Sequence, residues 1–169
     1  MRKLFVILLT VCLLTGCSSK KKAQEPPADH VVVMDTLSLT IPAEFTAVTV
    51  DNPYQKFMYQ KGTMFVNGYS ESIADLLKVF NSETITLGSY IQSFESNMIE
   101  QGILANSCTN CENNIWHMEY TSQVEGKEYT FLYVFYETDV SFWRVQGCCP
   151  TEEFEENREF LWNILTAVK

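Results

Sequence analysis

Apolar side chains recur along this chain with two spacings, one typical of strands and one typical of helices. Residues 37–41 alternate between apolar and polar types until Pro42 ends the run, as expected of a half-buried strand. Residues 55–61 and 63–70 lie on either side of Gly62 and predict a β-hairpin. The amino-terminal part of the domain should therefore be built from short antiparallel strands.

Three segments carry apolar residues at the three- and four-residue spacing of an amphipathic helix, namely residues 73–80, 89–101 and 151–167. In the second helix Glu95 falls on the opposite face, where we expect solvent. Gly102 follows this helix at a position suited to a left-handed cap. The predicted apolar faces are Ile73, Leu76, Leu77 and Phe80; then Tyr90, Ile91, Phe94 and Met98; then Phe154, Leu161, Ile164, Leu165 and Val168.

Four further strands are predicted between the last two helices, at residues 103–108, 114–124, 127–137 and 140–148. Polar turn residues separate them, so an antiparallel meander is expected. The third strand is apolar on both faces and must be covered on both. The predicted fold class is α+β, with an antiparallel sheet packed between helices in a single domain over residues 31–169.

The first 30 residues follow a different pattern. Two basic residues precede an apolar run over residues 4–14, which has the length of a signal-peptide core and is too short for a membrane-spanning helix. The run ends in Leu-Thr-Gly-Cys, which resembles a bacterial lipobox. We therefore expect residues 1–16 to be removed and Cys17 to carry a lipid anchor with acyl chains such as palmitate. Residues 17–30 are polar and proline-containing, and they predict a flexible linker.

Charge and anchor together restrict the partners. Loss of Arg2 and Lys3 leaves ten basic residues against 21 acidic ones, a formal net charge of −11. Nucleic-acid binding needs a basic surface, so no nucleic-acid partner is expected. The lipid on Cys17 makes the membrane a partner and predicts a location in the bacterial cell envelope, facing the periplasm. Ser18 beside the anchor favours the outer membrane.

The four cysteines beyond the anchor are the main chemical candidates. Cys108 and Cys111 have the C-x-x-C spacing of redox motifs and zinc sites. A redox thiolate needs a helix N-terminus, however, and this pair is predicted in a turn between strands. A local disulfide or a thiol pair stays open. The meander would place Cys148 and Cys149 about 25 Å away at the other end of the sheet. We therefore expect no shared zinc site and no bridge between the pairs.

Histidine chemistry has little support in the sequence. His30 lies at the end of the linker, and His117 shares a strand face with Glu119, where we expect a surface or partly covered side chain. No nucleophile with an orienting acid accompanies either histidine, and the seven glycines form no phosphate loop. We predict no catalytic residue, no metal site and no cofactor.

The chain resembles the PsbP-like proteins over roughly residues 35–169. The segments that carry the resemblance are "LSLTIPAEF", the hairpin, "SYIQSFESNMIEQG", "KEYTFLYVFYE" and "EEFEENREFLWNILTAV". The resemblance implies an antiparallel sheet between helical layers and a non-enzymatic envelope role in binding or assembly. Photosynthetic members bind metal and help to assemble a photosystem, but their metal-binding positions cannot be matched residue by residue to this sequence and are not carried over.

The function expected from these patterns is that of a membrane-tethered, non-catalytic binding or assembly module. Its soluble partner would be an envelope protein or a small ligand. The alternative is a metal- or thiol-handling envelope protein that uses Cys108 and Cys111.

Overall fold

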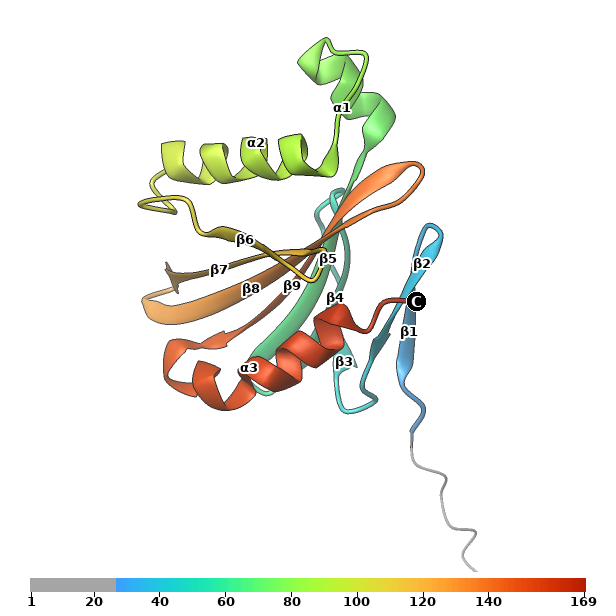
Figure 1. Ribbon diagram of the computed structural model, residues 1–169. Coiled ribbons are helices and arrows are strands. Elements are labelled where there is room, and N and C mark those ends of the chain that lie inside the picture. Colours follow the sequence, from blue (N-terminus) through green and yellow to red (C-terminus); the bar gives the residue numbers. More distant parts are fainter. Residues whose placement is uncertain (1–26) are drawn as a thin grey trace, which may run out of the picture.

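The computed structural model describes residues 27–169, and the chain forms a twisted seven-stranded antiparallel sheet in the order β3-β4-β5-β9-β8-β7-β6 (Figure 1). A separate two-stranded sheet, β1-β2, precedes it. The predicted signal peptide, the Cys17 anchor and most of the linker lie outside the described residues and stay predictions. The elements are β1 (His30–Met34), β2 (Leu37–Ile41), β3 (Thr46–Ala47), β4 (Gln55–Lys61), β5 (Met64–Ser72), α1 (Ile73–Phe80), α2 (Leu87–Glu100), β6 (Thr109–Glu112), β7 (Ile115–Val124), β8 (Lys127–Glu137), β9 (Ser141–Pro150) and α3 (Thr151–Thr166).

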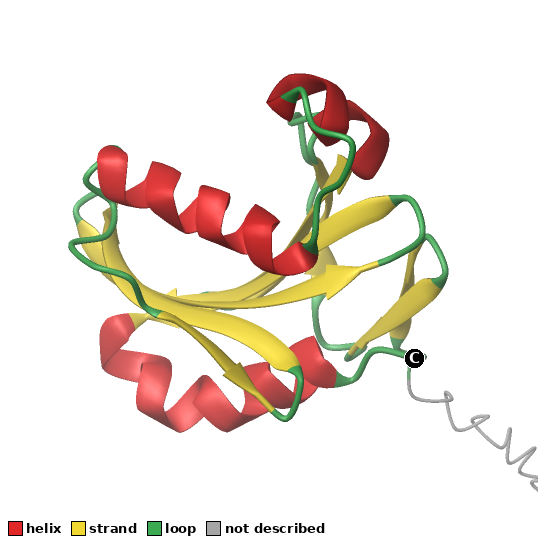
Figure 2. Ribbon diagram, turned by 45° about the horizontal axis from the view of Figure 1, so that its top comes forward, coloured by secondary structure: helices red, strands yellow, loops and turns green. Residues whose placement is uncertain are grey.

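Helices α2 and α3 cover opposite faces of the sheet (Figure 2), as the apolar pattern of β8 predicts. On the α3 face, Leu132 and Val134 pack in one buried cluster with Leu161. On the α2 face, Tyr133 and Phe135 pack in a second cluster with residues of α2. The prediction of an α+β fold with an antiparallel sheet between helices is confirmed.

Two tight turns set the register of the meander. The first turn has positive φ angles at Asn113 (51°) and Asn114 (63°). The second has them at Glu125 (52°) and Gly126 (81°). Positive φ at both central residues is typical of type I′ hairpins, which join β6 to β7 and β7 to β8. Asparagine and glycine adopt this conformation readily, so the polar turn residues of the sequence indicated these reversals.

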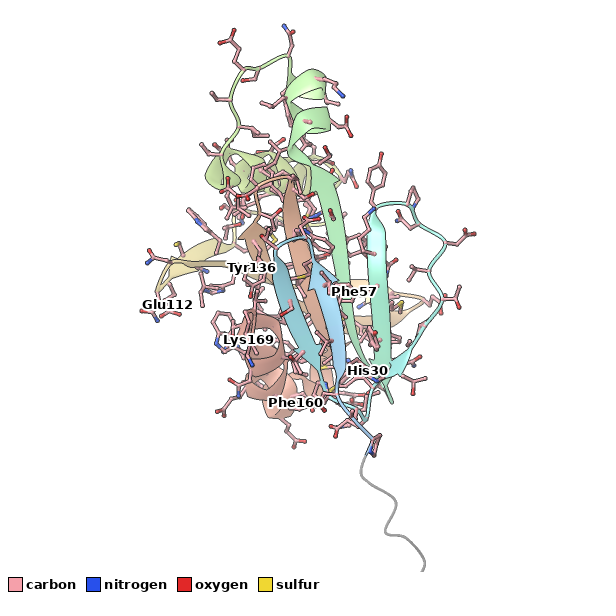
Figure 3. All side chains as sticks on the ribbon, turned by 90° about the vertical axis from the view of Figure 1, so that its right-hand side faces the viewer. His30, Phe57, Glu112, Tyr136, Phe160 and Lys169 are labelled. Atoms are coloured by element: carbon pink, nitrogen blue, oxygen red, sulfur yellow. The ribbon has the colours of Figure 1, made fainter. Side chains whose placement is uncertain are left out.

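The β1-β2 hairpin is fastened to the end of the chain. Ser38 and Lys169 exchange backbone hydrogen bonds of 2.9 and 3.0 Å, and Leu39 forms a β-bridge with Val168. Figure 3 shows Lys169 beside this hairpin. At the hairpin turn, the Asp35 carboxylate accepts hydrogen bonds from Trp143 Nε1 at 2.7 Å and from Thr138 Oγ1 at 2.9 Å. The hairpin is therefore an integral part of the fold.

The three predicted helices form, but they differ in how they pack. Helix α3 lies close to β9, because a Cβ added at Gly147 would stand 3.1 Å from Leu161. Helix α2 ends at Glu100, and Gly102 follows it in the predicted left-handed conformation (φ 71°). The next amide, that of Ile103, bonds to the Met98 carbonyl. Helix α1 projects from the end of β5 and has no buried residue. No helix among residues 27–169 is long and apolar enough to cross a membrane.

The strand predicted over residues 103–108 does not form. This segment is irregular, and the strand that pairs with β7 is Thr109–Glu112 instead. The cause is Glu95, which is buried rather than solvent-facing. Its carboxylate accepts hydrogen bonds from Ser107 Oγ, from the Cys108 amide, and from the amide and hydroxyl of Thr109. These bonds hold the end of the segment against α2 and delay its entry into the sheet.

Candidate functional site

A cleft of about 480 Å³ runs along one side of α2. The floor of the cleft is the α2 face of the sheet, at Tyr120, Tyr133 and Arg144. Helix α1 closes one end with the exposed side chains of Val79 (77% exposed) and Phe80 (47% exposed). The rest of the lining comes from β5, from α1, from a stripe of α2, and from two residues beyond the end of α2: Glu71, Leu76, Tyr90, Ser93, Phe94, Asn97, Met98, Gln101 and Ile103.

A charged pair, Glu71 and Arg144, lies at the α1 end of this cleft. Strands β5 and β9 are direct neighbours, and Tyr69 pairs with Arg144 across them. The Arg144 guanidinium reaches Glu71 at 3.2 Å. The Tyr90 hydroxyl donates to the same Glu71 oxygen at 2.5 Å. The pair therefore joins β5, β9 and α2 at the point where the cleft meets α1.

The guanidinium is held between two aromatic rings. Its central carbon stands 4.4 Å from the Phe94 ring centroid and 5.3 Å from that of Tyr69, both within cation–π range. The Arg144 side chain is 14% exposed and that of Glu71 is 27% exposed. Arg144 Nε is buried, and no hydrogen-bond partner for it exists among residues 27–169. An arginine carries five N–H donors, so the single carboxylate leaves donor capacity beside the cleft.

Tyrosine hydroxyls complete the polar side of the floor. Burial raises the pKa of Tyr120 to about 12. Burial also raises the pKa of Tyr90 and Tyr133. All three phenols are therefore protonated at neutral pH. They can donate and accept hydrogen bonds, but they do not act as bases.

A second cleft, of about 810 Å³, lies on the other side of α1. It shares Glu71, Leu76 and Val79 with the first cleft, and it extends to the β1-β2 hairpin at Asp35. Glu71 therefore stands at the junction of both clefts, at the base of α1.

The structure does not bring Cys108 and Cys111 together. Cys111 lies in strand β6 and Cys108 directly precedes it. Three residues of extended chain span about 10 Å, more than the roughly 7 Å that a disulfide tolerates between Cα atoms. Both are free thiols. Burial and the nearby Glu95 charge raise the pKa of Cys108, which disfavours the thiolate needed for redox or metal chemistry.

The predicted reason for keeping the two cysteine pairs apart is wrong. Cys108 lies beside Glu119, which pairs with Leu132, which in turn pairs with Gly147, the neighbour of Cys148. The two cysteine pairs therefore lie at a similar height along the strand direction. The reason is that the first strand of the meander starts at Thr109, after Cys108, and not at residue 103 as predicted. The pairs are separated sideways by three strand spacings, about 14 Å. Cys148 and Cys149 are buried free thiols, and burial raises the pKa of each to about 11.

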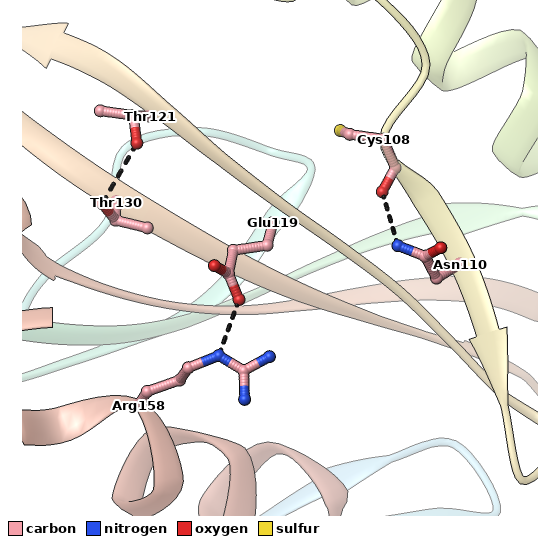
Figure 4. A network of polar contacts seen from close by, with 6 residues as sticks. All are labelled: Cys108, Asn110, Glu119, Thr121, Thr130 and Arg158. Carbon is pink, nitrogen blue, oxygen red and sulfur yellow. Dashed lines mark hydrogen bonds and ion pairs between the residues drawn. The ribbon is translucent and has the colours of Figure 1, made fainter. Parts of the chain in front are cut away.

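Both histidines lie away from the cleft. His30 Nε2 contacts the Phe45 carbonyl oxygen at 2.8 Å within the amino-terminal part of the domain. His117 was expected to be at the surface or partly covered, and it is more deeply covered than that, with 9% of it exposed, because Trp162 of α3 contacts it edge-on at 5.2 Å. Glu119 binds Arg158 rather than His117 (Figure 4). Within residues 27–169, no group of three or more His, Cys, Asp or Glu side chains could hold a metal ion.

Comparisons with known proteins place the fold. The chain is similar to cyanobacterial PsbP (CyanoP) from Synechocystis sp. PCC 6803, with a TM-score of 0.56, 9% identity, and coverage of 92% of this chain and 98% of that one. A protein from Bacteroides thetaiotaomicron VPI-5482 matches with a TM-score of 0.50 and 12% identity over 85% of this chain, which spans about half of that protein (48%). The fold is therefore PsbP-like, as the resemblance implied.

A more distant match is LpqN of Mycobacterium tuberculosis, a protein involved in cell envelope biogenesis. It has a TM-score of 0.46 and 12% identity, and the match covers 83% of this chain and 89% of that one. No protein-family model matches the sequence. No curated protein sequence matches it either.

The amino-acid pattern does not reveal the cleft. Glu71 lies just beyond the predicted hairpin arm of residues 63–70, and Tyr90 reads as a core position of α2. One signal was present: Arg144 is the one charged residue of the largely buried strand β9, and a charge in a covered strand requires a partner. The sequence could not indicate which acid supplies it.

Proposed function

We propose that this protein is a membrane-tethered, non-catalytic binding module, and that the cleft beside α2 holds its ligand. The observation that carries the proposal is the Glu71–Arg144 pair at the α1 end of an otherwise largely apolar and aromatic cleft. Ligand sites in proteins are typically concave and apolar, with a few placed polar groups. The ligand expected here has an apolar body beside Phe94 and Met98 and a polar group that reaches Arg144 or the tyrosine hydroxyls.

The chemistry of the lining supports binding over catalysis. The cleft offers an ion pair and protonated phenols, and the carboxylate that accepts from the Tyr90 hydroxyl is already engaged by Arg144. Burial raises the pKa of Tyr90 and keeps this phenol protonated, which makes it a poor nucleophile. The cysteine alternative has less support, because Cys108 and Cys111 stand apart. The tether is the lipid expected on Cys17. The chain enters β1 at the end of the domain opposite α1 (Figure 1), so an upright domain would present the cleft away from the membrane.

The cleft is tested by NMR on the full-length chain in detergent micelles, with a set of small aromatic and aliphatic carboxylates and amines as probes. We expect binding fragments to shift the resonances of Tyr90, Phe94 and Arg144. Val79→Asp should weaken this binding about tenfold, because it places a charge in the apolar end wall. Val31→Asp is the matched control, since Val31 is also an exposed valine (66%) but lines no part of the cleft. Fragments that leave the cleft resonances unmoved would refute the proposed site.

The tether is tested separately. Cys17→Ser should abolish metabolic labelling with a palmitate analogue and leave the precursor unprocessed or released. Lipid label that persists on the variant would show that the anchor lies elsewhere.

A further inference from the structure

One edge of the large sheet is incompletely covered. Strand β7 has ten residues, but β6 pairs only with its first four, Ile115–Met118. The chain before β6 turns away toward α2 at Cys108 (Figure 4). No backbone hydrogen bond outside the regular elements of residues 27–169 reaches the segment Tyr120–Val124. We call this segment the open β7 edge.

The two type I′ turns define which backbone groups face outward. In such hairpins the residues that flank the turn form a hydrogen-bonded pair, so Val124 bonds to Lys127 and Ile115 to Glu112. Alternation along the strand then directs Ser122 toward β8, and Thr121 and Gln123 outward. The amide of Glu119, the preceding outward residue, faces Cys108. Thr121 and Gln123 thus present two N–H and two C=O groups to an incoming strand.

The opposite edge of the sheet is protected in a way that the open β7 edge is not. There β3 pairs only with Tyr59 and Gln60 of β4. The unpaired part of β4 has a bulge between Gln55 and Phe57, carries Lys56 and follows Pro53. Bulges, lysines and prolines are the devices that prevent edge-to-edge pairing. The segment Tyr120–Val124 contains none of them, and its pairing with β8 shows no register shift. An unprotected edge of this length is suited to strand addition.

We propose that the open β7 edge binds an extended segment of a partner protein, which adds as an antiparallel strand in line with β6. The side chain opposite Ser122 would point to the α2 face beside Tyr120, which favours an apolar residue. Its neighbours, opposite Thr121 and Gln123, would point to the α3 face. There Glu155 lies on the same side of α3 as Thr151, which bonds to Thr130, and Arg158, which bonds to Glu119.

The negative charge beside the open β7 edge indicates which residues the partner segment should carry. Exposed glutamates dominate the first half of α3, and the chain as a whole is strongly acidic. A basic residue in the incoming strand therefore meets favourable charge on the α3 side, whereas a second copy of this acidic chain would be repelled. The partner segment is thus one in which basic and apolar residues alternate. This site is separate from the ligand cleft and does not depend on it.

The test uses the full-length chain in detergent micelles and the peptide acetyl-Thr-Lys-Val-Lys-Val-Lys-Thr-amide. In the free protein, the amides of Thr121 and Gln123 should exchange with solvent faster than those of Ser122 and Val124. Peptide should slow exchange at Thr121 and Gln123. Gln123→Pro removes one outward N–H and should weaken binding about tenfold or more, while Gln123→Ala should leave it within about twofold. Replacing the peptide lysines with glutamates should abolish binding.

Several outcomes would overturn the proposal. Equal exchange at Thr121 and Ser122 in the free protein would show that the edge is not open, and this readout needs no variant. Peptide binding that survives Gln123→Pro, or that Val79→Asp in the cleft abolishes, would place the peptide elsewhere. Absence of binding up to about 1 mM would exclude this partner chemistry. A dimer without peptide, dissolved by Gln123→Pro in sedimentation analysis, would make the edge an interface between copies instead.

Discussion

Arg144 shows how a single charge can be kept in a covered strand. Its guanidinium has ring faces on two sides, a carboxylate at one end and a cleft at the other. Aromatic faces attract a weakly hydrated guanidinium, so packing replaces part of the lost water. Lysine cannot make the same contacts, because it is a compact and strongly hydrated charge.

Removing one member of the Glu71–Arg144 pair should lower the free energy of unfolding by more than the loss of that residue's own contacts, because its partner is left unpaired. We expect Arg144→Met to lower the free energy of unfolding by about 2 kcal/mol or more, because Glu71 is left without its cation. Glu71→Gln should cost about 1 kcal/mol, since a neutral oxygen can still accept from Tyr90. Urea denaturation of the two variants and the double variant measures the coupling. Effects that add to within about 0.5 kcal/mol would show that the pair is not coupled.

Glu95 should make the fold sensitive to acid. Burial alone would raise its pKa, but the hydrogen bonds from Ser107, Cys108 and Thr109 hold the pKa of Glu95 below its usual value. A folded-state pKa below the unfolded one, about 4.3, means that the unfolded chain takes up the proton first. This contribution to stability is present above about pH 4.3 and is lost as the pH falls through the folded-state pKa.

Glu95→Gln should therefore flatten the acid side of the stability curve. At pH 7 we expect the variant to be less stable by about 1–3 kcal/mol, because a charged acceptor of several hydrogen bonds is lost. Between about pH 5 and pH 3 the variant should lose less stability than the unaltered protein. Denaturation midpoints measured across this range check the prediction. Parallel curves for the two proteins would show that Glu95 is not a source of acid sensitivity.

At the scale of elements, two glycines differ in how much room the structure leaves for a side chain. A Cβ at Gly68 of β5 would stand 2.2 Å from the Phe57 ring of the neighbouring strand, so the ring rests directly on the backbone. Nothing lies within 4 Å of a Cβ at Gly88, in the first turn of α2. Replacing glycine with alanine should therefore destabilise the protein at Gly68 and stabilise it at Gly88.

We expect Gly68→Ala to destabilise the protein by about 3 kcal/mol, because the Phe57 ring must leave its position. Gly88→Ala should stabilise it by about 0.5–1 kcal/mol by reducing the backbone freedom of the unfolded chain. Thermal unfolding of both variants measures the difference. A Gly68→Ala protein as stable as the original would show that Phe57 can move without cost.

Elements built from local signals could be predicted, and those that depend on distant contacts could not. The hairpins and the end of α2 follow from turn residues and a glycine cap that act within a few positions. The false strand at residues 103–108 has two physical causes at its two ends. The backbone amides of Ile103 and Leu104 bond to the Met98 carbonyl at the end of α2, and Glu95 holds the end near Cys108 against the helix. Likewise, the burial of His117 depends on Trp162, which only the packing of α3 brings near.

At the scale of the whole molecule, the sheet joins two cores into one packed unit. Strands β8 and β9 contribute to the cluster under α3 and to the cluster under α2, so neither can form without them. The amino-terminal hairpin belongs to the α3-side cluster through the fully buried Met34, Leu39 and Ile41. This arrangement could be predicted only in outline, because the apolar strand β8 indicates two covered faces but not which elements cover them.

If the hairpin is part of this unit, loosening its turn should weaken the entire domain. Asp35→Ala removes the acceptor for Trp143 Nε1 and Thr138 Oγ1, and we expect a loss of about 1–2 kcal/mol in the free energy of unfolding. Tryptophan fluorescence and far-UV circular dichroism should report the same shifted urea midpoint, as for a two-state domain. Val33→Ala, an exposed change on the same hairpin, should leave the midpoint unchanged. A fluorescence transition that precedes the dichroism transition in Asp35→Ala would instead make the hairpin a separate unit that detaches before the sheet unfolds.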